Sequence, residues 1–80
     1  MTSEHVLDAR GLMCPEPIRE AELALRALPS GTRLSVLATD PASPIDFEAW
    51  CFHQSHHYLG CEDRGDWLEI RIQKGNLKTG

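Results

Sequence analysis

The spacing of apolar residues changes several times within 80 residues, and this alternation restricts the possible folds more than any other feature. Between Ile18 and Leu28, apolar residues recur every three or four positions, as on one face of a helix. Over 33–39 and again over 67–74 every second residue is apolar and shares one face, as in strands with one buried face. Helices and strands that are apolar on one side must cover each other, so the pattern predicts two layers.

The remaining segments complete the order of elements. A short extended segment over 5–9 precedes the first helix, and Pro29-Ser30-Gly31 ends that helix. A second helix is expected from about 44 to 57, with Ser43 as its N-cap and Pro44 in its first turn. A third strand over 58–61 leads through a polar turn into the last strand.

We therefore predict an α/β two-layer sandwich of order βαβαββ, with two helices packed on one face of a four-stranded mixed sheet. It forms a single domain over residues 1–80, with 76–80 as a frayed tail.

Composition narrows the classes of function. The net charge is −4, and each half of the chain carries more acidic than basic residues, which disfavours direct tight binding to nucleic acid. The apolar runs are too short to cross a membrane, and no basic segment leads into an apolar one at the N-terminus. We expect a cytoplasmic protein whose three cysteines are free thiols.

Cys14 stands directly before the first helix, in the run Cys14-Pro15-Glu16-Pro17. The positive end of a helix favours thiolate over thiol, and the prolines stiffen the segment that presents the sulfur. Pro15 and Pro17 have no N–H, so only Glu16 and Ile18 could donate to the sulfur, and Glu16 also carries a like charge. We expect a modestly lowered pKa for Cys14. Because no histidine lies nearby in sequence to act as its base, exchange of a group with another protein is favoured over independent catalysis.

The run Leu7-Asp8-Ala9-Arg10-Gly11-Leu12-Met13-Cys14-Pro15-Glu16-Pro17 resembles the signature of the TusA-like (SirA-like) sulfur-carrier family. The resemblance covers nearly the whole chain and continues in Pro29-Ser30-Gly31, Asp40-Pro41-Ala42, Asp46, Trp50-Cys51 and Lys74-Gly75. It implies two helices on a four-stranded mixed sheet, in agreement with the pattern above.

The resemblance also implies that Cys14 carries sulfur as a persulfide, a transient group that needs no other cofactor. The implied partners are a sulfur donor protein, such as a cysteine desulfurase or a rhodanese, and a downstream acceptor protein. Implied destinations are 2-thiouridine in tRNA, molybdenum-cofactor enzymes and sulfur oxidation. Members of the tRNA-thiolation branch often have arginine before the cysteine, where this chain has Met13, so the branch stays open. A carrier rather than a turnover enzyme is expected, and a monomer suits an accessible thiol.

Other residues admit a structural or a functional interpretation. Cys51 and Cys61 are expected to be buried, with Cys61 on the same core-facing side as Leu59. Trp67 could be an exposed docking residue or pack against a helix. Three cations are expected to be solvated or to form a docking rim around Cys14: Arg10, Arg19 and Lys74.

His53 and His57 would lie four residues apart on one helix face, with Cys51, His56 and Cys61 nearby. The spacing is unlike that of structural zinc sites, so no metal is expected, and the histidines are expected to cap the end of the helix. Two alternatives to a sulfur carrier are a regulatory or adaptor module that uses the same surface without sulfur transfer, and a small metal-binding protein.

Overall fold

A computed structural model describes residues 4–75, and the predicted frayed tail over 76–80 lies outside these residues. The elements follow one another as β1 (Glu4–Ala9), α1 (Glu16–Arg26), β2 (Arg33–Ala38), α2 (Ser43–Gln54), β3 (His57–Asp63) and β4 (Leu68–Gln73). The four strands form one sheet in the order β1-β2-β4-β3. β1 and β2 are parallel, and β4 is antiparallel to both β2 and β3.

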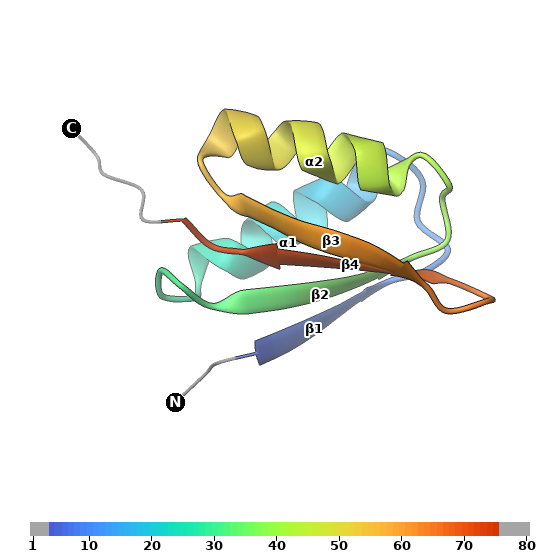
Figure 1. The fold of residues 1–80 in the computed structure, drawn as a ribbon, viewed down its shortest axis with the longest axis horizontal. Helices are drawn as coiled ribbons and strands as arrows, with labels where there is room; N and C mark the ends of the chain where they lie inside the picture. The colour runs from blue at the N-terminus through green and yellow to red at the C-terminus, as the bar shows by residue number, and fades with distance from the viewer. Residues whose placement is uncertain (1–3, 76–80) are drawn as a thin grey trace.

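Both helices cover the same face of this sheet (Figure 1), with α1 packed mainly on β1 and β2 and α2 mainly on β3. The predicted α/β two-layer sandwich is therefore confirmed. The core lies between the layers and consists of Ala9, Ala21, Leu25, Leu34, Val36, Ala38, Phe47, Cys51, Ile70 and Ile72. The buried residues of β2 are those that the alternating pattern predicted to point inward.

The second helix differs from the prediction at both ends. Ser43 is the first residue of α2, and Ala42, which makes no side-chain cap, holds the N-cap position. At the other end Ser55 adopts a left-handed conformation (φ 63°, ψ 27°), and the N–H of His56 bonds to the carbonyl of Cys51. This αL residue ends the helix after Gln54, so His56 and His57 lie beyond α2 instead of in its last turn.

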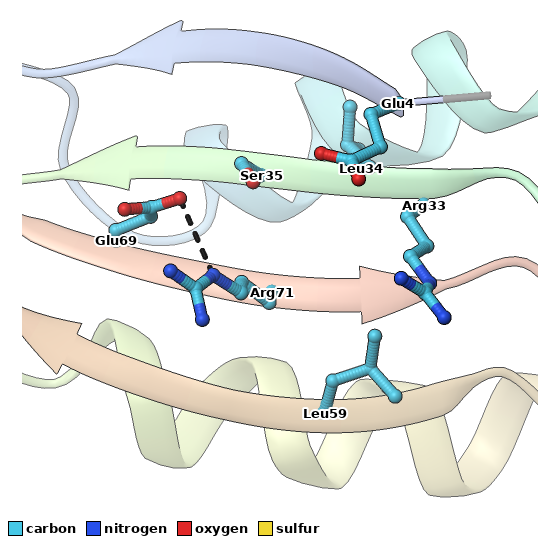
Figure 2. Close-up of a pocket in the computed structure, with 7 residues that line it drawn as sticks. All are labelled: Glu4, Arg33, Leu34, Ser35, Leu59, Glu69 and Arg71. Atoms are coloured by element: carbon cyan, nitrogen blue, oxygen red, sulfur yellow. Dashed lines mark hydrogen bonds and ion pairs between the residues drawn. The ribbon is translucent and has the colours of Figure 1, made fainter. Parts of the chain in front are cut away.

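The third strand contains a register irregularity that overturns one prediction. Between Tyr58 and Gly60 the pairing with β4 shifts, so that Tyr58 faces Ile72 and Cys61 faces Ile70. Residues directly opposite in an antiparallel pair share a face, so Cys61 lies on the helix side of the sheet. Leu59 lies on the uncovered side, as Figure 2 shows. The expected common core-facing side of Leu59 and Cys61 is wrong, because one extra residue reverses the alternation.

Neither helix of the described region is long and apolar enough to cross a membrane.

Candidate functional site around Cys14

The parallel pairing of β1 and β2 brings two loops together at one edge of the sheet. Ala9 and Ala38, the last residues of the two strands, are paired, so the segments that follow them run side by side. The N–H of Gly11 donates to Oγ1 of Thr39 at 2.9 Å, which ties the loops together. Each loop leads into the N-terminus of a helix, so the starts of α1 and α2 meet at this edge.

Cys14 lies at this junction with its side chain exposed. Pro15 is the N-cap of α1, and Pro17 fills a first-turn position that needs no intrahelical N–H partner. The N–H of Glu16, a predicted donor to the sulfur, bonds instead to the carbonyl of Met13 at 2.8 Å. The thiol is thus held at the mouth of α1, beside the Met13 side chain, which is 74% exposed.

Two carboxylates from the second loop and helix surround Cys14. Asp40 accepts the backbone N–H of Cys14 on Oδ2 at 3.3 Å, and its Oδ1 accepts the N–H of Ala42 at 3.0 Å. Asp40 therefore fixes the cysteine loop and also satisfies a donor at the start of α2, the task that the sequence assigned to Ser43. Asp46, one turn into α2, is the second carboxylate that acts on the Cys14 thiol.

The pKa of Cys14 is raised above its usual value, contrary to the lowered pKa expected from the helix terminus. The hydrogen bond to Asp46 is the largest cause, followed by partial desolvation and by the negative charges of Asp46 and Asp40. Each of these effects disfavours the thiolate. Neither carboxylate was predicted as a neighbour of Cys14, although parallel pairing of the strands before Cys14 and Asp40 would place them together.

The loop before Cys14 is held by Arg10, which was expected either to be solvated or to belong to a docking rim. The guanidinium of Arg10 pairs with the carboxylate of Asp8 at 2.8 Å and lies 4.9 Å from the ring centre of Trp67. Hydrogen bonds from Arg10 lower the pKa of Asp8 to about 2. Arg10 thus joins β1 to the start of β4, and Trp67 is half-buried beside it instead of packing on a helix.

Lys74 has a structural position at the opposite end of the molecule from Cys14. Its Nζ donates to the carbonyls of Leu25 and Leu28 at 2.7 and 2.6 Å, and so satisfies groups at the C-terminal end of α1. Because Cys14 precedes the N-terminal end of the same helix, Lys74 cannot belong to a rim around the thiol, and that prediction is wrong. Arg19 is exposed in α1, close to the cysteine end, and its docking role stays a prediction.

The other two cysteines differ in exposure. Cys51 is 1% exposed in the core, as predicted, and burial raises its pKa to about 11. Cys61 is exposed, which contradicts the prediction that it is buried, and its pKa is raised by partial desolvation and by Asp63 and Glu62. All three cysteines are free.

The histidines do not form the expected pair on one helix. His53 belongs to α2, whereas His57 begins β3. His56 packs against Trp50, and its Nδ1 accepts the N–H of Gly75 at 3.0 Å, so its ring nitrogen already has a structural partner. Within residues 4–75, no three histidine, cysteine or acidic side chains are grouped as metal ligands.

A shallow hollow of about 440 Å³ lies on the uncovered face of the sheet (Figure 2). Charged side chains from three strands line this hollow, among them Arg33 and Arg71. The Arg71 guanidinium pairs with the Glu69 carboxylate. None of the cysteines lines it, and it lies on the other side of the sheet from the helices.

Comparison with known proteins identifies the family. A family model described as sulfurtransferase TusA matches residues 5–74, which is nearly the whole described region. The chain belongs to the TusA family.

The TusA-family relatives that it resembles are named as sulfur carriers. The protein named "Putative sulfur carrier protein YrkI" from Bacillus subtilis is 45% identical over 75 residues, which cover 94% of this chain and all of that protein. "Putative sulfur carrier protein YrkF" from the same organism is 41% identical over 75 residues, but this chain spans only 40% of its length.

A crystal structure of a SirA-like protein from Desulfitobacterium hafniense is 27% identical to this TusA-family chain, with a TM-score of 0.72. The similarity covers 90% of this chain and 99% of that protein, so it extends to the whole fold. Family, relatives and fold together support a general sulfur-carrier function.

Proposed function

We propose that this TusA-family protein accepts sulfane sulfur as a persulfide on Cys14 and passes it to the thiol of a downstream acceptor protein. The observation that carries the proposal is the position of Cys14, which is exposed and lies directly before α1. Two prolines follow it closely, and the Asp40 carboxylate accepts its backbone N–H. A small thiol on a firmly held tip can enter the active site of another protein. Buried Cys51 offers no such access.

The transfer is a thiol exchange in which sulfur moves between two cysteines. The Cys14 thiolate attacks the terminal sulfur of a donor Cys–S–SH group, and the donor's S–S bond breaks. The donor leaves as a thiolate, and the transferred sulfur keeps its proton, so Cys14 becomes Cys14–S–SH. An acceptor thiolate then repeats the same step on Cys14–S–SH. Charge and electrons balance in both steps, and no resident cofactor takes part.

In this proposal the donor is a protein persulfide, of the kind formed by a cysteine desulfurase or a rhodanese. The acceptor belongs to one of three routes that the family resemblance implies: tRNA thiolation, molybdenum-cofactor sulfuration or sulfur oxidation. The carrier acts in the cytoplasm as a monomer, and the three routes are distinguished by which purified acceptor discharges the loaded protein.

Intact mass after incubation with a cysteine desulfurase and cysteine tests the loading step. We expect a gain of one sulfur that reducing agent reverses, and we expect the Cys14→Ser variant to show no gain. A gain that persists in Cys14→Ser contradicts the proposal. Partner binding and cellular phenotype that survive Cys14→Ala would instead support an adaptor that uses this surface without sulfur transfer.

A further inference from the structure

The outer face of α2 carries large apolar side chains that the fold leaves uncovered. Ile45 is 72% exposed and Phe52 is 83% exposed, while Phe47 and Cys51 of the same helix are buried. Ile45, Ala49 and Phe52 follow at intervals of four and three residues, so they form one stripe about 10 Å long. This outer stripe, defined by Ile45, Ala49 and Phe52, borders a hollow of about 400 Å³ that Glu48 and His53 also line.

The first helix of the same molecule exposes fewer large apolar side chains than α2. The exposed positions of α1 are mostly charged, as is normal for a helix with one buried face, and Leu23 is its one large apolar residue on the outside among the described residues. A helix with apolar residues on both sides indicates a second contact surface, and exposed apolar patches on small proteins commonly mark sites of protein association.

The outer stripe begins beside the candidate site. Ile45 is adjacent in sequence to Asp46, whose carboxylate acts on the Cys14 thiol, and α2 begins where the Asp40 carboxylate accepts the N–H of Cys14. The exposed Met13 side chain precedes Cys14 on the other helix entry. A protein that reaches the Cys14 sulfur from the α2 side would therefore cover the stripe in the same contact.

The charges around the stripe specify the chemistry of that protein. α2 contains the carboxylates Asp46 and Glu48 and no lysine or arginine, and Asp40 lies next to Cys14. The Arg10 guanidinium is already paired with Asp8. Opposite charge on the partner is favoured because complementary potentials accelerate encounter and exclude wrong partners.

We infer that the outer stripe of α2 is the docking surface for the protein that loads Cys14, and that this donor presents an apolar side chain flanked by lysine or arginine beside its own persulfide. The inference rests on the proposed sulfur-carrier function and adds the contact surface and the chemistry of the donor. A cationic group of the donor near Asp46 and Asp40 would also favour the Cys14 thiolate at the moment of contact.

The test compares loading by a protein donor with loading by a small donor that needs no docking. The protein donor is a cysteine desulfurase with cysteine, the small donor is glutathione persulfide, and intact mass follows the gain of sulfur. We expect the double variant Ile45→Ser/Phe52→Ser to be loaded at least about tenfold more slowly by the desulfurase, as when one anchoring residue of an interface is lost. Its loading by glutathione persulfide should equal that of the wild type.

Matched variants separate docking from general effects. Leu23→Ser removes an apolar side chain that is 53% exposed on α1, and it should change neither rate. Glu48→Lys should slow only the desulfurase reaction, by a factor that shrinks as salt is raised. The inference is overturned if the double variant and Leu23→Ser behave alike, or if the desulfurase loads the wild type no faster than glutathione persulfide does. If neither donor loads Cys14, the proposed function itself fails.

Discussion

Replacing Lys74 by methionine tests whether this residue stabilises the fold or takes part in docking. The substitution keeps a flexible side chain of similar length and removes the Nζ that donates to the carbonyls of Leu25 and Leu28. Leu25 lies in the last turn of α1, and its carbonyl also accepts the N–H of Leu28 at 3.1 Å, whereas Leu28 lies just beyond the helix.

The size of the effect follows from the two hydrogen bonds. A hydrogen bond from a charged group contributes about 1.5–3 kcal/mol, and partial access of water to these carbonyls replaces some of that loss. We therefore expect the free energy of unfolding to fall by about 2 kcal/mol. For a domain of this size, that corresponds to a decrease in Tm of about 8–16 °C.

Thermal and urea unfolding measure this loss, and the rate of Cys14 loading measures docking. The control is Arg26→Met, which removes an exposed pair with Glu22 and should cost about 0.5 kcal/mol or less. We expect Lys74→Met to lower stability without changing the loading rate at a temperature where it is folded. Unchanged stability together with slower loading would refute the structural role and restore Lys74 to the docking surface.

Three further substitutions test other contacts. Asp46→Asn should lower the pKa of Cys14, because it removes the carboxylate that contributes most to raising it. The pH dependence of iodoacetamide alkylation measures this pKa, and an unchanged profile would exclude an effect of Asp46 on the thiol. The pKa of His56 is lowered from 6.5, chiefly by burial and also by the charges of Lys74 and His57, so the unfolded chain binds its proton more readily. The free energy of unfolding should therefore decrease as the pH falls from 6.5 to the folded-state pKa of His56. In urea titrations, His56→Gln should flatten this pH dependence, whereas His53→Gln should retain it. The same pH dependence in both variants would contradict the assignment to His56. Gly75→Ala would place a Cβ inside van der Waals contact of the Ser55 carbonyl oxygen, so a backbone shift costing about 1–3 kcal/mol is expected. A urea midpoint equal to that of the wild type would argue against this packing.

The order of elements could be predicted because it depends on local patterns. The alternation of Leu34, Val36 and Ala38 gave the buried side of β2 directly, and the spacing from Ile18 gave the buried face of α1. The end of α2 could not be predicted in this way, because a serine at position 55 takes the left-handed conformation that sequence rules assign mainly to glycine.

The position of Cys14 before a helix could be predicted from the sequence, but the direction of its pKa shift could not. The Cys-Pro-x-Pro run placed Cys14 before a helix, and the structure agrees. The raised pKa depends on Asp40 and Asp46, which are distant in sequence and reach the thiol only through the parallel pairing of β1 and β2. The position of Leu59 on the uncovered face likewise depends on a register shift in β3 that leaves no mark in the pattern of apolar residues.

Locating the transferred sulfur within the chain tests the proposed function most directly. After loading, persulfides are labelled by differential alkylation, and the labelled peptides are identified by tandem mass spectrometry. We expect the label on the peptide that contains Cys14, with Cys51 and Cys61 recovered as ordinary thiols. A label on Cys61, or an equal distribution between Cys14 and Cys61, would contradict a carrier built around the mouth of α1.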